Sequence, residues 1–307
     1  MSVLGAGSAD RRVFFGPHGL RAGWRIALFA LIAYAMVLAL GSLALALGVP
    51  SGGTAGFALL LAAVLLAGSV VIVWVDGRPA GALGFALEPR AARDFLLGTG
   101  LGGVLLGAAV LLLAVASTAR WVADEGTVPE YVAVLASTFA FFAVAAALEE
   151  ALFRGYAFQA LVQGIGVWPA VLASSALFAV AHGNNPNVAP LGLANIFLAG
   201  VMLAVAYLRT RSLWFATGVH LGWNWTMATL LDFPVSGFVS DTPLYSAVAA
   251  GPALWTGGDF GPEAGIPATL ALAAGTVWLW RTPRLAPSEG MRVRRPLVDD
   301  RLEAGAS

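Results

Sequence analysis

The amino-acid sequence predicts an all-α protein, a polytopic bundle of transmembrane helices. Of its 307 residues, 59% are hydrophobic and 11% are charged, whereas soluble domains contain about 45–50% apolar and about 25% charged residues. So few charges cannot cover a water-soluble particle of this length, which argues against a soluble enzyme, a disordered chain and a nucleic-acid-binding protein. Helices are expected because backbone polar groups must be satisfied inside the bilayer. The absence of cysteine excludes disulfides and thiolate metal sites.

Eight apolar segments are candidate transmembrane helices, which need about 17–25 residues each. In chain order they cover residues 24–47, 54–75, 94–119, 131–162, 168–182, 189–208, 213–231 and 266–280. The first three are nearly continuous apolar stretches of ordinary length. The fourth is long enough to bend or to project beyond the membrane, and the fifth and eighth are close to the lower length limit. The sixth and seventh are joined by a short connection that carries two arginines.

The regions outside these segments are short, so a single transmembrane domain is expected over residues 24–281. It is preceded by an N-terminal arm, residues 1–23, in which His18 is expected to be solvated. It is followed by a polar, arginine-rich tail, residues 282–307, which we expect to be flexible and close to anionic lipid. The longest connection, residues 232–265, is rich in glycine, proline and acidic residues.

The arginines predict the orientation of the bundle. All 17 basic residues are arginine, and 15 of them lie before or at the start of the first segment, in the second and sixth connections, or after the eighth segment. These regions share one side of an eight-span bundle, whereas the opposite side has only Arg120, together with seven acidic residues. Because cytoplasmic loops carry the excess of basic residues, both termini are expected in the cytoplasm.

Three charged residues lie within one apolar stretch, residues 139–158. An ionisable group at membrane depth costs about 2.5–3.5 kcal/mol and marks a functional site by default. Glu150 and Arg154 are spaced i, i+4, so they can form a structural ion pair on one helix face. Glu149 points about 100° away from that face and has no partner in its own helix. We therefore expect Glu149 to be functional.

Two histidines and an amide are the other polar groups of interest at depth. His182 lies at the end of the fifth segment and His220 within the seventh, with Asn224 four residues later on the same helix face. A lone histidine on an apolar helix is more often a packing residue. Together with Glu149, however, two imidazoles and an amide supply the groups that activate a water and stabilise an oxyanion.

The pattern Glu149-Glu150-x-x-x-Arg154, then Phe178-x-x-x-His182, then His220-x-x-x-Asn224 resembles the CAAX prenyl protease and bacteriocin-processing family of intramembrane endopeptidases, bacterial type. The contexts EEALFRGYAFQAL and YLRTRSLWFATGVHLGWNW fit as well. The three motifs cover residues 149–224, about a quarter of the chain, in the order that the family has.

The resemblance implies distinct roles for these residues. Glu149 and His182 would activate the water, and His220 and Asn224 would form the oxyanion hole. Glu150, Arg154 and Phe178 would support the site, and the substrate would be a membrane-associated protein or peptide.

A metal site stays an alternative, since Glu149, His182 and His220 form a sound zinc ligand set. We favour a reaction without a cofactor. The sequence has no HExxH motif, and zinc-bound histidines need acceptors for which it offers few candidates beyond Glu150.

Two other functions compete with proteolysis. A proton-coupled transporter would have matching polar helices in both halves, but the polar groups at depth all follow residue 148. A non-catalytic membrane scaffold or immunity protein of the same family is the stronger alternative, because a fold does not fix a function. The lysine-free, arginine-rich composition suggests the inner membrane of a bacterium.

Overall fold

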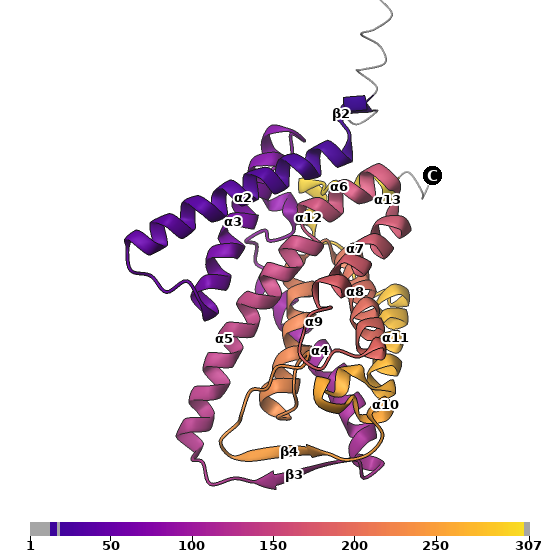
Figure 1. Ribbon diagram of the computed structural model, residues 1–307. Helices are drawn as coiled ribbons and strands as arrows, with labels where there is room; N and C mark the ends of the chain where they lie inside the picture. The colour runs from indigo at the N-terminus through magenta and orange to yellow at the C-terminus, as the bar shows by residue number, and fades with distance from the viewer. Residues whose placement is uncertain (1–12, 17–18, 304–307) are drawn as a thin grey trace, which may run out of the picture.

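The computed structural model of the protein describes residues 13–16 and 19–303. His18 and the first twelve residues of the expected N-terminal arm lie outside the described residues. The described chain is predominantly helical, and its strands form two small ribbons rather than a closed sheet (Figure 1). The expected all-α bundle of membrane helices is therefore confirmed.

Each of the eight expected segments contains a helix. The helices are α2 (Ala22–Ala46), α3 (Gly53–Trp74), α4 (Ala91–Val115), α5 (Val128–Phe153), α6 (Tyr156–Ile165), α7 (Val167–Ala181), α8 (Pro190–Thr210), α9 (Leu213–Trp225) and α11 (Ile266–Arg281). Five segments of the described chain are long and apolar enough to cross a membrane: α2, α3, α4, α8 and the combined α5–α6. The remaining expected spans, α7, α9 and α11, have only 15, 13 and 16 residues.

The fourth expected segment is broken near its end, as its length suggested. Thr127 and Glu130 form a capping box that starts α5, and each side chain hydrogen-bonds the other's backbone N–H. The helix ends at Phe153, and α6 begins two residues after Arg154. A side chain at Gly155 would place a Cβ 2.1 Å from the carbonyl oxygen of Ala151. The glycine therefore permits the sharp change of direction between α5 and α6.

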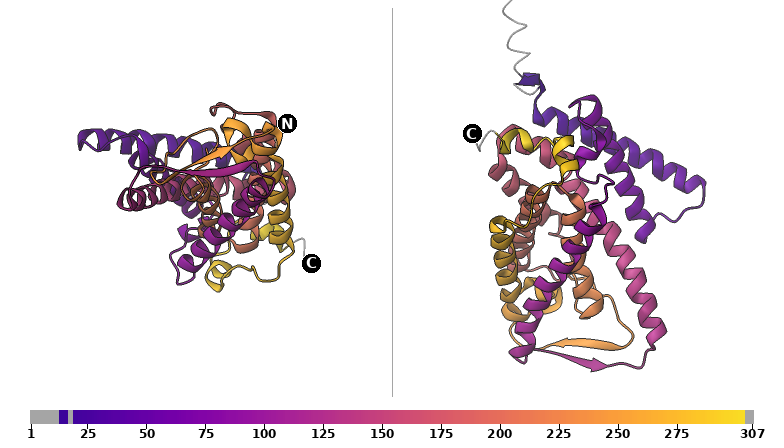
Figure 2. Two further views of the ribbon diagram at one scale, coloured as in Figure 1. Left: turned by 90° about the horizontal axis from the view of Figure 1, so that it is seen from below. Right: turned by 180° about the vertical axis from the view of Figure 1, so that it is seen from behind.

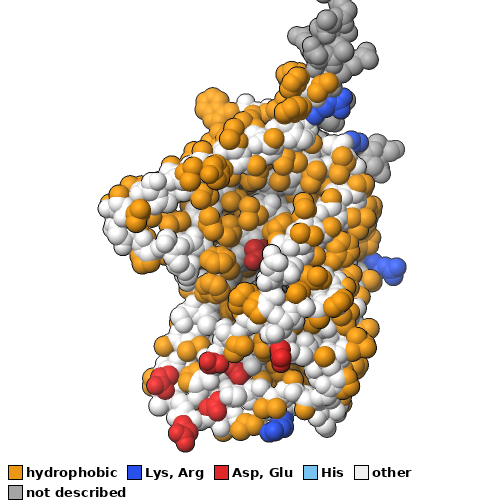
Figure 3. All heavy atoms as spheres, in the orientation of Figure 1, with side chains coloured by type: hydrophobic (Ala, Val, Ile, Leu, Met, Phe, Trp, Pro, Cys, Tyr) orange, Lys and Arg blue, Asp and Glu red, His pale blue; other side chains and the backbone are white. Residues whose placement is uncertain are grey.

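Strands and short helices cover one end of the bundle, and the sequence did not predict them. Strand β3 (Ala119–Ala123) pairs antiparallel with β4 (Tyr245–Ala249) across that end (Figures 1 and 2). The long connection before α11 also contains α10 (Ala253–Thr256), η3 (Gly258–Phe260) and η4 (Pro262–Ala264). Acidic side chains gather at this end (Figure 3), which we call the acidic end. The cytoplasmic location of the opposite end stays a prediction.

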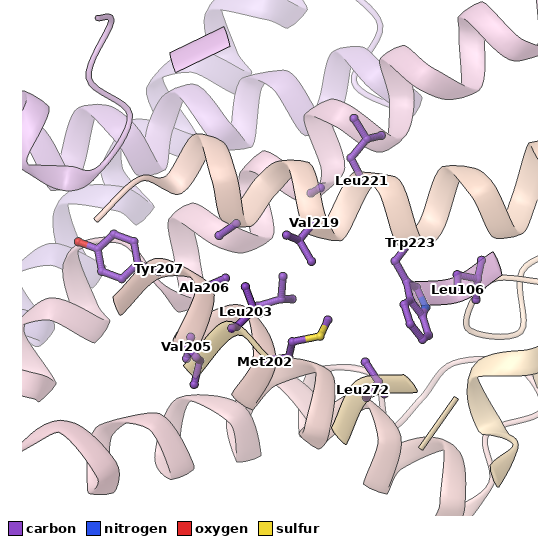
Figure 4. Close-up of a cluster of buried hydrophobic side chains, with 14 of the residues drawn as sticks. Leu106, Met202, Leu203, Val205, Ala206, Tyr207, Val219, Leu221, Trp223 and Leu272 are labelled. Atoms are coloured by element: carbon purple, nitrogen blue, oxygen red, sulfur yellow. The ribbon is translucent and has the colours of Figure 1, made fainter. Parts of the chain in front are cut away.

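Helix α9 lies at the centre of the bundle. Its buried side chains Val219, Leu221 and Trp223 pack with residues of α4, α8 and α11, including Leu106, Met202, Leu203 and Leu272 (Figure 4). In contrast, α2 and α3 form a hairpin that projects to one side of the bundle in both views of Figure 2. The most deeply placed helix is thus the one that carries His220 and Asn224.

Glycines bring α4 and α9 into close contact. A Cβ at Gly98 or Gly102 of α4 would lie 2.3 or 2.0 Å from backbone oxygens of α9, and a Cβ at Gly218 or Gly222 of α9 would lie 2.3 or 2.0 Å from backbone oxygens of α4. Small residues spaced four apart allow such backbone approach between membrane helices. Gly218 and Gly222 flank His220, so this contact sets the depth and rotation of the histidine.

The C-terminal tail differs from the expected flexible segment. Its described part, up to residue 303, contains α12 (Glu289–Arg294) and α13 (Asp299–Leu302), and Val298 is fully buried. Arg211 contacts Asp299 at 2.7 Å and Arg78 contacts Asp300 at 3.1 Å. The tail is held because it supplies apolar groups and carboxylates to an end of the bundle that is rich in arginine. Counting its arginines alone suggested only an attraction to lipid.

Candidate active site

The structure brings Glu149, His182 and His220 together from three helices. The Oε2 atom of Glu149 lies 3.9 Å from Nε2 of His182 and 3.7 Å from Nε2 of His220. These separations are too long for direct hydrogen bonds, and Oε2 has no hydrogen-bond partner among the described residues. The Glu149 side chain as a whole is 27% exposed. Its carboxylate can therefore meet water while one oxygen faces both imidazoles.

Glu150 joins the expected ion pair to the second histidine. Its Oε1 atom accepts a hydrogen bond from Arg154 Nη1 at 3.1 Å and lies 3.0 Å from His220 Nδ1. Glu150 and Arg154 are fully buried, so the pair predicted from their spacing forms. Arg154 also donates to the backbone oxygen of Gly200, and its Cζ lies 4.5 Å from the centre of the Phe178 ring. The two glutamates thus have different environments although they are neighbours in the sequence.

Backbone geometry fixes the orientation of His182. The residue ends α7, and its Nδ1 atom lies 2.8 Å from the carbonyl oxygen of Phe178. A carbonyl oxygen only accepts hydrogen bonds, so Nδ1 carries the proton and Nε2 is left toward Glu149. The Phe178 ring lies 4.7 Å from the His182 ring and 6.0 Å from the His220 ring. Phe178 therefore contacts Arg154 and both histidines at once.

Asn224 shares a cavity of about 50 Å³ with the two histidines. The cavity is lined by His182, His220 and Asn224 and by apolar side chains of α8, α9 and α11. Glu149 does not belong to this lining. His182, His220 and Asn224 thus line one cavity, and Glu149 lies within 4 Å of both histidines without lining it.

Sequence reasoning missed Glu263, which also lines this cavity. It belongs to η4 and is only 7% exposed, and its Oε1 atom accepts a hydrogen bond from Ser236 at 2.6 Å. Burial raises the pKa of Glu263, against the opposing effects of the Ser236 hydrogen bond and of nearby His182. Glu263 lies in a connection with no recognisable motif, so the sequence carried no signal that could have placed it here.

The residues present suit a metal chemically but are not gathered around one point. Both histidines have an acceptor at Nδ1, the backbone oxygen of Phe178 or the Glu150 carboxylate, as metal-bound histidines require. The sequence could not reveal the backbone acceptor. Among the described residues, however, no three histidine, aspartate or glutamate side chains form a group that could hold a metal ion.

Comparison with known proteins agrees with the motifs. No curated protein matches the chain. Residues 131–226 match the family model described as type II CAAX prenyl endopeptidase Rce1-like. This segment contains α6, α7 and α8, nearly all of α5 and the whole of α9. It therefore includes all seven residues singled out by the sequence motifs, from Glu149 to Asn224. The match covers the helices that meet at the site, and over these residues this membrane protein is similar to the Rce1-like type II CAAX prenyl endopeptidases.

Proposed function

We propose that this protein is an intramembrane endopeptidase that hydrolyses a peptide bond of a membrane-associated protein or peptide. The observation that carries the proposal is the Glu149 carboxylate, which faces Nε2 atoms of two histidines at 3.7 and 3.9 Å within a helical membrane bundle. The family supports a CAAX-type intramembrane protease in general terms. The roles below assign individual steps to residues of this chain.

Glu149 and His182 activate the attacking water. Glu149 Oε2 and His182 Nε2 are 3.9 Å apart and make no direct hydrogen bond, so both groups are free to bind the same water. The water attacks the carbonyl carbon of the peptide bond, and Glu149 takes the proton that it loses. Glu149 then gives this proton to the leaving amine as the C–N bond breaks, so the carboxylate is regenerated. General acid–base catalysis of this kind contributes about 10²–10⁴-fold.

His220 and Asn224 stabilise the oxyanion that forms on the carbonyl oxygen. Asn224 donates from its amide, and His220 donates from Nε2 when it is an imidazolium. The charges of Glu149, Glu150 and Arg154 add up to one negative charge, which an imidazolium at His220 balances. Glu150 lies 3.0 Å from Nδ1 of His220 and favours this form, because a carboxylate stabilises a nearby cation.

Arg154 and Phe178 support these groups rather than react. Arg154 balances Glu150 in a buried site, where an isolated carboxylate is costly. Phe178 packs against Arg154 and His182 and supplies the carbonyl oxygen that orients His182.

We propose that the reaction needs no metal ion, with zinc at Glu149, His182 and His220 as the alternative. Exhaustive chelation of the purified protein separates the two. Activity that survives chelation and does not rise on adding zinc supports the metal-free reaction, whereas activity lost on chelation and restored by zinc supports the alternative.

Substitutions at the site test the proposed function itself. We expect Glu149→Gln and His182→Ala each to lower peptide cleavage at least about 10²-fold without loss of folded protein. Glu125→Gln, at an exposed glutamate before α5, is the matched control and should be unaffected. Membrane peptides that accumulate in cells with Glu149→Gln identify the substrate. If both active-site variants stay fully functional, a non-catalytic scaffold or immunity protein is the better description, and a transporter would be tested next.

We propose that the protein works in the inner membrane of a bacterium. Its five long apolar helices place it within lipid, and its substrate must reach it there or at the membrane surface.

A further inference from the structure

The cavity beside the histidines has two chemically different parts. Most of its wall is apolar, with Ile196, Leu203 and Leu272 among the lining residues. Ser236 and Glu263 add polar atoms from the connection between α9 and α11. A water molecule needs on the order of 10–15 Å³ of such space, so a cavity of about 50 Å³ takes a group of only a few atoms. It is too small for a long side chain.

The segment that carries Glu263 is held in place by groups outside the cavity. The amide of Asn195, itself 1% exposed, donates to the backbone oxygens of Glu263 and Gly265 at 2.7 and 3.1 Å. Thr269 in turn donates to the Asn195 side chain. Gly261, just before η4, has φ of 109°, a conformation that favours glycine. The backbone of this segment is therefore held by contacts that do not use the Glu263 carboxyl, which is left to bind Ser236 and to line the cavity.

A buried carboxyl next to an apolar wall makes a selective acceptor. The carboxyl already accepts a hydrogen bond from Ser236, and a carboxylate has about four acceptor sites, so a hydroxyl that enters the cavity can add a donor, whereas an apolar group cannot. Sites built to bind a substrate hydroxyl reject the analogue that lacks it far more strongly than apolar pockets reject an added methyl group. A long cationic side chain fits neither the volume nor the apolar wall.

We propose that Glu263 and Ser236 form the polar end of a substrate subsite beside His182, His220 and Asn224, and that this subsite takes the small hydroxyl side chain of serine or threonine next to the cleaved bond. The inference rests on the proposed peptidase function and adds a substrate preference to it. Glu263 is here a specificity residue and takes no part in the bond-breaking step.

The test uses the full-length protein in detergent micelles and a peptide library in which each residue varies, with cleaved bonds identified by mass spectrometry. For the best substrate, kcat/KM is then compared for matched peptides with threonine or valine, and serine or alanine, at the selected position. We expect the hydroxyl peptide to be preferred by about tenfold or more, tenfold corresponding to ~1.4 kcal/mol. Glu263→Met should bring the ratio close to one, while Glu263→Gln, which keeps an acceptor oxygen, should retain most of it.

The outcomes separate the two proposals. Cleavage that depends on Glu149 but shows no hydroxyl preference, or a Glu263→Met variant that slows all peptides equally, contradicts the subsite and leaves the peptidase intact. Absence of any cleavage that depends on Glu149 contradicts the peptidase and the subsite with it. If Glu263→Met does not yield folded protein, Ser236→Ala provides the decisive measurement. It should lower the hydroxyl preference, and an unchanged ratio would overturn the subsite.

Discussion

The close contact between α4 and α9 leads to a prediction about Gly102. A Cβ at this position would lie 2.0 Å from the carbonyl oxygen of Val219 and 2.8 Å from the backbone nitrogen of Trp223. Ordinary contact begins at 3.4 Å, so Gly102→Ala requires the helices to separate by up to 1.4 Å. Both of these atoms belong to the backbone and cannot move aside as a flexible side chain would.

The expected cost has two parts. Overpacking of this kind destabilises proteins by about 1–3 kcal/mol, which we expect as a lower melting temperature in detergent. A displacement of about 1 Å at a catalytic group can also cost on the order of 10²-fold in rate. Because α9 carries His220 and Asn224, Gly102→Ala should lower kcat for a cleaved peptide more than it raises KM.

Gly100→Ala is the matched control, since it makes the same change in the same helix, where the added carbon meets no other part of the protein within 4 Å beyond its own stretch of helix backbone. Its melting temperature and kcat should equal those of the unaltered protein or slightly exceed them. Equal behaviour of Gly100→Ala and Gly102→Ala would refute the argument that the α4–α9 contact positions the site. The same would follow if Gly102→Ala lost stability but kept its full kcat.

Two further predictions concern a buried ion pair and a carboxyl group in a connecting loop. Arg154→Met leaves the Glu150 carboxylate buried without its cation and should lower the free energy of unfolding by about 3–5 kcal/mol. The double variant Glu150→Gln/Arg154→Met removes both charges, so its free energy of unfolding should fall by less. If denaturation shows that the double variant loses the sum of the two single losses, the pairing is contradicted. Burial raises the pKa of Asp232, which accepts hydrogen bonds from the backbone of Thr242 and Ala247. Because the folded protein then holds this proton more tightly than the unfolded chain, the contribution of Asp232 to stability is greatest below its ordinary pKa and is lost as pH rises through the raised value. Melting temperatures measured across this range should fall less steeply in Asp232→Asn, and an unchanged slope would speak against the raised pKa.

The sequence was most informative about features that depend on residues close together in the chain. Long apolar runs predicted the membrane helices, and the i, i+4 spacing of Glu150 and Arg154 predicted their ion pair, because both depend on neighbours along one helix. The separation of Glu149 from that pair followed from the same geometry. The glycines of α4 and α9 were visible as a repeated four-residue spacing, but nothing in the sequence indicated which helices they join.

Contacts between distant segments could not be predicted in this way. Glu263 enters the cavity because Asn195 holds the backbone of η4, and no local pattern encodes that hydrogen bond. The acceptor for His182 is a backbone oxygen, which every residue possesses and which no residue type reveals. The β3–β4 pair joins segments more than 100 residues apart, and the alternation of such short strands is too weak to recognise.

The packed tail has a consequence for how the protein is made. Asp299 and Asp300 pair with Arg211 and Arg78, and Asp300 also accepts a hydrogen bond from Gln163. A ribosome makes these two carboxylates only after α11 and all the apolar segments before it. The nascent bundle must therefore hold Arg78, Arg211 and Gln163 in water or against lipid headgroups until Asp299 and Asp300 have been added. Assembly of the arginine-rich end thus depends on a segment made after the membrane helices, and a variant truncated before Asp299 would be left with that end open.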